Sequence, residues 1–412
     1  MRHLGSLVVA LALVADLRSA MAREVLRATP KQCLRLEKRV AGAELRAQAN
    51  PTGARAQAKF YSQSRKYATR CVHLNEIQVL GTHNSYHVRP LEPLWSALLA
   101  FLPELSQLDY THIPLDQQFS DQGIRQIELD VSYDPNGGLY ADRIIMALFG
   151  LPTASGIPAL DQPGFKVLHL NDIDFQSTCY TFVECLQQVK TWSDARPWHL
   201  PITILVEAKD DPTPDPLGIG FVTPLLFTPA AFDALDAEIR SVFPPERIIT
   251  PDLVRGSFAT LEEAVLATGW PTLGEARGKV MFLLDNGGHY KADYLAGHPA
   301  LAGRILFTDA NPGDPDAGFS KQNDPLAPAI PGLVAQGYVV RTRADADTLE
   351  ARAGNTVPRD TAIASGAQWV STDYPVPNPA FGTGYFVAIP DGHPARCNPV
   401  NAPGGCRSTA LE

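Results

Sequence analysis

The stretch VLGTHNSYHV, residues 79–88, passes from apolar to polar residues in its middle, and this change indicates the fold. Val79 and Leu80 end an apolar run, Gly81 follows, and His83 and Asn84 then open a series of hydrogen-bonding side chains. A short apolar run of this kind is typical of a strand buried on both faces of a parallel sheet. Polar groups directly after such a strand lie at its carboxyl end, where α/β proteins place their active sites.

Similar apolar runs recur along the chain, so that eight strands are predicted. They occupy residues 77–82, 126–131, 166–170, 202–207, 280–285, 304–308, 338–341 and 369–372. Helix-like segments lie between them, among them 181–195, 229–241, 259–268 and 344–353. This alternation predicts an α/β fold with a parallel sheet, and eight strands favour a (β/α)8 TIM-like barrel. An open doubly wound sheet is the alternative, but no G-x-G-x-x-G fingerprint follows the first strand.

The two ends of the chain differ in composition from the predicted barrel, residues 71–376. Residues 1–22 combine a basic start, an apolar stretch too short to span a bilayer and a small-residue cleavage pattern, so we expect a secretory signal peptide cut after Ala22. Residues 23–70 are rich in Ala, Arg, Gln and Leu and predict a helical extension. Residues 377–412 are rich in Pro and Gly and predict a loop tail. The protein is therefore expected to be secreted or periplasmic.

Six cysteines in an exported chain predict three disulfides. Proximity in the sequence favours one of about 15 possible connectivities. Its pairs are Cys33–Cys71, Cys179–Cys185 and Cys397–Cys406, the last of which would pin the C-terminal tail. Zinc is the competing use of cysteine, but the sequence has no C-x2-C pair. The net charge of -9 disfavours nucleic acid and gives no basic patch for anionic lipid, and nothing implies an obligate protein partner.

Polar side chains also close or follow most of the other predicted strands. In chain order the candidates are His83, Asn84, Glu128, Asp130, His169, Glu207, Lys209, Asp285, Arg341, Arg343, Asp373 and Tyr374. Glu128 and Asp130 are two residues apart, so in a strand they share one face. Together with Glu207 and the amide oxygen of Asn84, they form an oxygen-only set that favours a hard cation, Ca2+ more than Mg2+.

Each of these residues also has a purely structural interpretation. A single strand histidine is more often a buried structural residue than a catalyst, and a carboxylate such as Asp285 or Asp373 often caps the following helix. Arg341 and Asp373 could equally form an ion pair. His87 and His112 are loop histidines for which solvated or supporting roles are expected. The joint occurrence of two histidines and three acids at one barrel mouth favours a functional site.

Four motifs of the chain resemble one family. They are GTHNSY at 81–86, IELD at 127–130, HLND at 169–172 and LVEAKDD at 205–211. They are similar to the calcium-dependent phosphatidylinositol-specific phospholipase C-like family of PLC-like phosphodiesterases, over about residues 71–376. Glycerophosphodiester phosphodiesterases differ in having His-Arg-Gly after the first strand. Metal-independent bacterial phospholipases have a basic residue in place of the acids on the second strand.

The resemblance implies a role for each matching residue. His83 corresponds to the histidine that assists the inositol 2-hydroxyl, and His169 to the general acid that protonates the departing diacylglycerol oxygen. The Ca2+ ligands implied are Asn84, Glu128, Asp130 and Glu207. The substrate-binding candidates are Lys209, Asp285, Arg341, Asp373 and Tyr374. The expected products are a cyclic inositol phosphate and diacylglycerol, and two histidines are suited to proton transfer near neutral pH.

The substrate implied is a phospholipid at a membrane surface. The apolar stretches 94–102, 144–152 and 217–227 either form a ridge that enters the membrane or pack on the barrel as amphipathic helices. Two other functions remain open. One is a phosphodiesterase acting on glycerophosphodiesters or other phospholipids, and the other is a non-catalytic barrel that binds lipid or carbohydrate.

Overall fold

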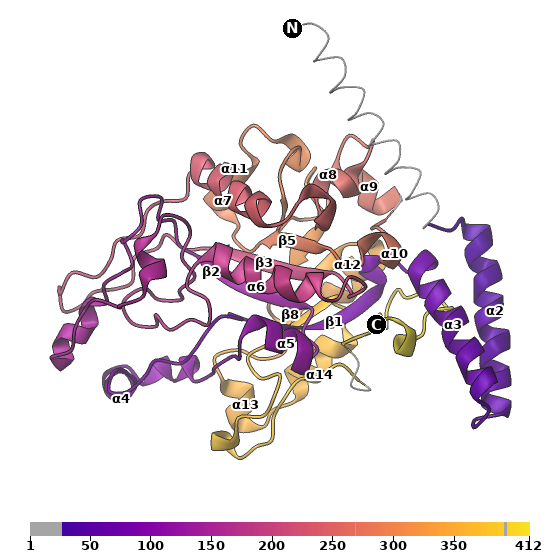
Figure 1. Ribbon diagram of the computed structural model, residues 1–412, viewed down its shortest axis with the longest axis horizontal. Coiled ribbons are helices and arrows are strands. Elements are labelled where there is room, and N and C mark those ends of the chain that lie inside the picture. Colours follow the sequence, from indigo (N-terminus) through magenta and orange to yellow (C-terminus); the bar gives the residue numbers. More distant parts are fainter. Residues whose placement is uncertain (1–26, 268, 391–393) are drawn as a thin grey trace, which may run out of the picture.

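The computed structural model describes residues 27–267, 269–390 and 394–412, so the predicted signal peptide lies outside the described residues. Its centre is a parallel sheet wound into a barrel (Figure 1). The barrel strands are β1 (Ile77–Thr82), β2 (Gln126–Val131), β3 (Ile202–Ala208), β5 (Val280–Leu284), β6 (Leu306–Thr308), β7 (Phe319–Lys321), β8 (Val339–Arg343) and β9 (Trp369–Thr372). A two-residue strand, β4 (Ile248–Ile249), pairs with the start of β5.

The strands pair in the order expected of a closed barrel. β1, β2, β3, β5 and β6 form one continuous parallel run, and β7, β8, β9 and β1 form the other. Between β6 and β7 the described chain has one isolated parallel bridge, Asp309 to Phe319, which we call the β6–β7 seam. The predicted TIM-like α/β fold is therefore confirmed.

One of the predicted strands is wrong. Residues 166–170 form no strand of the sheet, because β2 pairs directly with β3 over six residues. Lys166 instead makes isolated antiparallel bridges to Ser132 and Thr181, and its buried ammonium lies 3.1 Å from an Asp134 carboxylate oxygen. The segment is thus held by the loops on either side of it. The eighth strand of the barrel is instead β7, which lies between β6 and β8 and is not predicted by any apolar run in the sequence.

Helices surround the barrel, and several of them begin where the sequence provides a cap. They are α2 (Pro30–Ala49), α3 (Ala54–Cys71), α4 (Leu94–Phe101), α5 (Leu115–Asp121), α6 (Phe182–Asp194), α7 (Pro229–Val242), α8 (Pro251–Arg255), α9 (Leu261–Ala267), α10 (Leu273–Ala276), α11 (Gly288–Leu295), α12 (Ile330–Gln336), α13 (Leu349–Ala353) and α14 (Val357–Ala364). The Thr181 and Thr228 side chains accept hydrogen bonds from backbone amides in the first turns of α6 and α7. In the described part of the chain, no helix has both the length and the apolar character that a membrane crossing requires.

The two ends of the described chain meet at the amino ends of the strands. α2 and α3 form a hairpin, and α3 packs on α10 and on the 3-10 helix η9 (Ser408–Ala410). α10 directly precedes β5, and only the 3-10 helix η1 (Leu74–Glu76) separates α3 from β1, which fixes the hairpin at the end of the barrel opposite its mouth. The tail is not entirely loop, because β10 (Ala395–Cys397) pairs antiparallel with β1. All three predicted disulfides are present: Cys33–Cys71, Cys179–Cys185 and Cys397–Cys406.

A second apolar cluster lies apart from the core of the barrel. We call it the rim cluster, and its buried members are Leu94, Trp95, Leu98, Leu105, Leu108, Tyr140, Ile145, Leu168, Ile173 and Phe175. They come from α4, from the 3-10 helix η3 (Ile144–Phe149) and from the loops that follow β1 and β2. Figure 1 shows α4 and these loops on the side of the molecule opposite α2 and α3. The rim cluster therefore supports the loops around the mouth.

Candidate active site

Three carboxylates meet at the carboxyl ends of β2 and β3. Asp130 lies directly opposite Glu207 in the parallel register of these strands. Glu128 is two residues before Asp130 and so shares its face of β2. One carboxylate oxygen from each of the three lies within 4.8 Å of the others. The spacing of Glu128 and Asp130 and the pairing of β2 with β3 therefore place the three carboxylates together, as the sequence predicts. We call these three residues the acid cluster.

The acid cluster and Asn84 have the features of a cation site. Both carboxylate oxygens of Asp130 and the amide oxygen of Asn84 are buried without a hydrogen-bond partner among the described residues. Asn84 has a φ of 42°, a left-handed conformation that asparagine tolerates better than most residues. Its amide nitrogen donates to the Tyr110 hydroxyl at 3.1 Å, which orients the amide. Oxygen acceptors without donors are suited to a hard cation such as Ca2+.

The electrostatics of the acid cluster also favour a cation. Burial, followed by repulsion from Glu207, raises the pKa of Asp130 well above its ordinary value. Burial raises the pKa of Glu128 to about 7, although Arg341 opposes this change. A divalent ion stabilises the ionised form of such carboxylates. The residues therefore fit the Ca2+ site that was predicted.

Two predicted substrate-binding cations instead contact these acids. The Lys209 ammonium lies 3.2 Å from an oxygen of Glu207 and 3.4 Å from an oxygen of Asp130. Burial lowers the pKa of Lys209, but these two carboxylates outweigh it and raise the pKa above its ordinary value. Arg341 Nη2 lies 2.5 Å from Glu128 Oε2, so its ion-pair partner is Glu128 and not Asp373.

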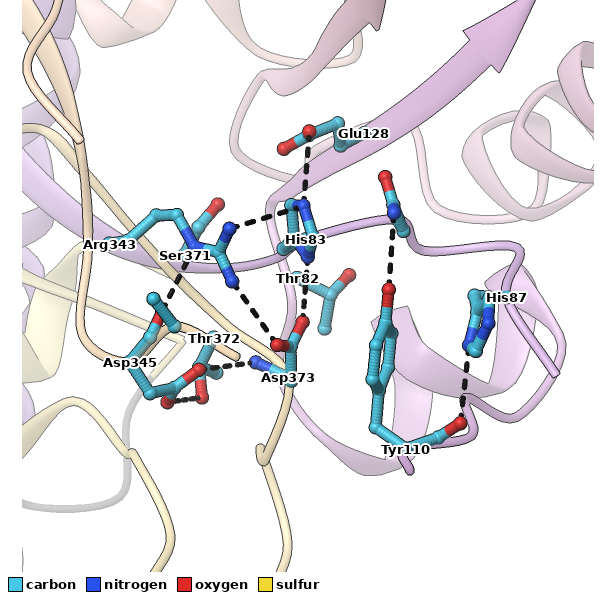
Figure 2. Close-up of polar contacts among 12 residues, drawn as sticks. Thr82, His83, His87, Tyr110, Glu128, Arg343, Asp345, Ser371, Thr372 and Asp373 are labelled. Atoms are coloured by element: carbon cyan, nitrogen blue, oxygen red, sulfur yellow. Dashed lines mark hydrogen bonds and ion pairs between the residues drawn. The ribbon is translucent and has the colours of Figure 1, made fainter. Parts of the chain in front are cut away.

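His83 directly follows β1 and is held beside the acid cluster (Figure 2). Its Nδ1 lies 2.8 Å from Asp373 Oδ1, and its Nε2 lies 3.3 Å from Arg343 Nη1 and 3.7 Å from Glu128 Oε1. Burial, followed by the charge of Arg343, lowers the pKa of His83 to about 3. The imidazole is thus neutral: Nδ1–H donates to Asp373, and Nε2 accepts from Arg343.

Asp373, predicted to bind substrate, is itself held by a buried network (Figure 2). Its backbone amide donates to Asp345 at 2.9 Å, and its Oδ2 lies 3.2 Å from Arg343 Nη2. Asp345 also accepts from the hydroxyls of Thr372 at 2.5 Å and Tyr385 at 3.1 Å. Burial, followed by repulsion from Asp373, raises the pKa of Asp345 to about 7. This network determines where Asp373 places the imidazole of His83.

The second predicted catalytic histidine shares a carboxylate with a third histidine. His169 Nδ1 lies 2.7 Å from Asp174 Oδ2, and His87 Nε2 lies 2.8 Å from the same oxygen. His87 Nδ1 is 3.1 Å from the Tyr110 carbonyl oxygen, and the two rings stack at 4.2 Å. His87 and Asp174 are fully buried, so of the two roles expected for His87 the solvated one is wrong, and its contact with Asp174 agrees with the supporting one. His112 Nε2 contacts the backbone carbonyl oxygen of His83 at 2.9 Å.

The contacts of Asp285 and Tyr374 are with other parts of the mouth. Asp285 Oδ2 lies 2.6 Å from the ammonium of Lys321 on β7. Tyr374 is buried, and its hydroxyl donates to the Asp109 carbonyl oxygen at 3.2 Å. Their assignment to substrate remains a prediction. Asp174, Asp345 and Tyr110 carry no recognisable signal in the sequence, because each acts through a neighbour that only the folded loops bring close.

Residues 72–399 match the family model for phosphoinositide phospholipase C, Ca2+-dependent. No curated protein matches the chain significantly. Similar solved structures include a calcium-dependent phosphoinositol-specific phospholipase C from a Pseudomonas species, with 16% identity over 80% of this chain and 96% of that chain and a TM-score of 0.48. A Ca2+-dependent phosphatidylinositol-specific phospholipase C from Streptomyces antibioticus has 19% identity over 76% of this chain and 97% of that chain, with a TM-score of 0.46.

The family match spans most of the chain and includes every residue of the acid cluster and both predicted catalytic histidines. The phosphodiesterase activity and the Ca2+ cofactor expected from the sequence agree with that family and with the acid cluster. The chain therefore belongs to the Ca2+-dependent phosphoinositide phospholipase C family, and it is a phosphodiesterase whose cofactor is Ca2+.

Proposed function

We propose that this enzyme cleaves phosphatidylinositol by attack of the inositol 2-hydroxyl on phosphorus, releasing a cyclic inositol phosphate and diacylglycerol. The observation that carries this proposal is the position of His83, whose unprotonated Nε2 is 3.7 Å from an oxygen of the acid cluster. A neutral imidazole next to a cation site can take a proton from a hydroxyl whose phosphate is bound at that site. This arrangement suits an internal nucleophile on the substrate.

In the first step, the 2-hydroxyl transfers its proton to His83 Nε2 while its oxygen attacks phosphorus. Asp373 accepts the hydrogen bond from His83 Nδ1–H throughout this step and stabilises the imidazolium that forms. Arg343 donates to Nε2 in the free enzyme, so it must release this nitrogen when the hydroxyl arrives. The freed guanidinium is then available to a phosphate oxygen.

His169 supplies the proton for the leaving group. Its Nδ1 is bound to Asp174, which leaves Nε2 as the nitrogen that can protonate the diacylglycerol oxygen as the P–O bond breaks. Asp174 fixes the ring and is fixed in turn by His87. Asn84, Glu128, Asp130 and Glu207 would hold the Ca2+ ion, which would supply positive charge to offset the negative charge of the phosphate oxygens.

We further propose that the mouth meets its lipid substrate through an apolar rim. Phe101, Leu148 and Leu226 have exposed fractions of 83%, 53% and 68%, although neighbouring side chains pack into the rim cluster. The three apolar stretches noted in the sequence thus contribute both to packing and to an exposed surface, which suits shallow contact with a membrane. Export is also proposed, because all six cysteines pair in disulfides, as is typical of oxidising compartments.

Phosphorus NMR of the products tests the proposed reaction. The expected result is a five-membered cyclic phosphodiester formed from phosphatidylinositol when Ca2+ is present, with none formed by the His83→Ala variant or in excess chelator. Glycerophosphocholine and phosphatidylcholine, assayed side by side, are expected to remain intact. An acyclic monoester as the first product would overturn the 2-hydroxyl mechanism, and faster turnover of either choline compound would overturn the substrate.

A further inference from the structure

Charge is distributed very unevenly between the N-terminal hairpin and the rest of the molecule. Residues 27–71 carry eleven lysines and arginines and only two glutamates, whereas residues 72–412 carry 21 basic and 40 acidic residues. The net charge of -9 therefore conceals a strongly basic hairpin attached to a strongly acidic barrel. The expectation that the chain has no basic patch for anionic lipid is wrong, because that expectation used the total charge alone.

Most basic side chains of the hairpin are exposed and are not neutralised by other residues in the described part of the chain. Nine of them are exposed and form no salt bridge with another described residue: Lys31, Arg35, Lys38, Arg39, Arg46, Arg55, Lys59, Arg65 and Lys66. Glu44 does not offset them, since it pairs with Arg407 of the C-terminal tail. Unpaired cations on a folded helix attract a multivalent anion from solution.

The outer face of α2 combines these cations with apolar side chains. Leu36, Val40, Ala43 and Ala47 form the face that is buried in the molecule. Leu34 and Leu45 lie about three turns apart on the opposite face, with exposed fractions of 60% and 67%. Lys31, Arg35, Lys38 and Arg46 lie along one side of this line at helical spacing. Exposed leucines among lysines and arginines are typical of helices that lie on an anionic membrane.

The hairpin is held rigidly and is separate from the catalytic machinery. The Cys33–Cys71 disulfide ties the start of α2 to the end of α3, and α3 packs on α10 and η9. All nine exposed cations precede residue 72, where the match to the phospholipase family begins. The hairpin lies at the amino ends of the strands, opposite α4 and the mouth (Figure 1). Its surface is therefore not required to bind the substrate.

We propose that the outer face of the α2–α3 hairpin is a docking site for anionic lipid headgroups. A polyanion such as nucleic acid would satisfy the charges but would leave Leu34 and Leu45 without an apolar partner, whereas a lipid surface accommodates both. Each basic residue near an anionic bilayer strengthens partitioning roughly fivefold. A molecule docked in this way has its mouth turned away from the surface that holds it. Docking is thus independent of phosphatidylinositol as substrate.

Vesicle co-sedimentation of the full disulfide-bonded chain tests this proposal without any substrate lipid. The vesicles contain phosphatidylcholine alone or phosphatidylcholine mixed with phosphatidylglycerol. Binding is expected only to the anionic vesicles and is expected to weaken as salt is added. The variant with Lys31, Arg35, Lys38 and Arg46 all changed to Glu should bind more than roughly tenfold more weakly. In a matched control, each Lys is replaced by Arg and each Arg by Lys at the same four positions, and this variant should bind like the wild type.

Two further measurements distinguish lipid docking from a folding defect and from the binding of other polyanions. Hydrolysis of a water-soluble inositol phosphodiester should be unchanged in the charge-reversed variant, so that a folding defect is distinguished from lost docking. The double variant Leu34→Ser and Leu45→Ser should bind anionic vesicles several-fold more weakly. Equal binding to both vesicle types would overturn the proposal. So would an unchanged affinity of the charge-reversed variant. Tighter binding to a DNA duplex, with no effect of the leucine changes, would replace the lipid by a polymeric anion.

Discussion

At the scale of single residues, His83 depends on Asp373 for its tautomer. The carboxylate accepts from Nδ1–H, which leaves Nε2 as the base. The variant Asp373→Asn replaces this acceptor with an amide whose NH2 group can donate to Nδ1, so the ring proton moves to Nε2. We expect kcat to fall by about 10²- to 10⁴-fold with little change in KM. Steady-state kinetics on a water-soluble inositol phosphodiester measures both constants, with Asp360→Asn, whose partner is the nearby Arg359, as the matched control. An unchanged kcat would show that Asp373 does not position the base.

Asn84 provides the second test at this scale. Its buried amide oxygen has no partner in the described structure, so its removal should affect a bound cation directly. We expect Asn84→Ala to weaken Ca2+ binding by roughly tenfold or more, whereas Asn84→Asp, which keeps an oxygen at this position, should retain much of it. Isothermal titration calorimetry with Ca2+ measures the affinity without turnover. Equal affinities for Asn84→Ala and the wild type would remove Asn84 from the ligand set.

The same residues show which parts of a site can be read from a sequence. Glu128 and Asp130 share a face because strand periodicity requires it, and the end of a neighbouring strand brings Glu207 opposite them. Asp174 could not be identified in this way. Its partners His87 and His169 are joined only when two loops fold together, and no periodicity encodes that contact. Likewise, the pairing of Arg341 with Glu128 rather than Asp373 depends on barrel closure.

At the scale of elements, a strand could be predicted where its run of apolar residues is long. β1, β2 and β3 each contain six or seven residues, and an apolar pattern of that length is distinctive. β7 has three residues, Phe319–Lys321, and includes a serine and a lysine, so no hydrophobic run marks it. Residues 166–170 have the apolar pattern, but the loop contacts of Lys166 keep them out of the sheet. Pattern alone does not distinguish a buried strand from a buried connecting segment.

The segment between α6 and β3 contains a buried histidine, His199, that links stability to pH. His199 Nδ1–H donates to the Leu200 carbonyl oxygen at 2.5 Å, and the Ser193 hydroxyl lies 2.6 Å from Nε2. Burial lowers the pKa of His199 to about 4, so the unfolded chain takes up a proton near pH 6.5 and the folded chain does not. The stabilising contribution is therefore present above pH 6.5 and is lost as the pH falls towards 4.

We expect the unfolding free energy of the wild type to fall more steeply between pH 6.5 and about 4 than that of His199→Asn, by up to about 1 kcal/mol per pH unit. Urea denaturation at a series of pH values gives the two curves. The difference between them removes the contributions of the other titrating groups. Parallel curves would mean that His199 does not titrate differently in the folded and unfolded chains.

At the scale of the whole molecule, the hairpin and the barrel are expected to respond separately to loss of one disulfide. Replacing Cys33 and Cys71 by serine opens a loop with a sequence separation of 38 residues, for which chain entropy predicts a loss of about 3–4 kcal/mol. Hydrogen exchange should show faster exchange in α2 and α3, while the phosphodiesterase activity is retained. The double variant Cys397→Ser and Cys406→Ser serves as the comparison, since it should loosen β10 instead. Loss of activity in the hairpin variant alone would show that the barrel requires the hairpin.

The β6–β7 seam should allow the catalytic mouth to open transiently. The backbone supplies one bridge there, and side chains supply much of the rest: the Lys321 ammonium binds Asp285 across the seam, and the Lys321 amide donates to Asp309. Ionic contacts weaken with added salt far more than ladder hydrogen bonds do. The barrel should therefore open and close transiently at the β6–β7 seam before it does so elsewhere. The frequency of opening should rise with ionic strength, so the salt concentration sets the mobility of one wall of the catalytic mouth.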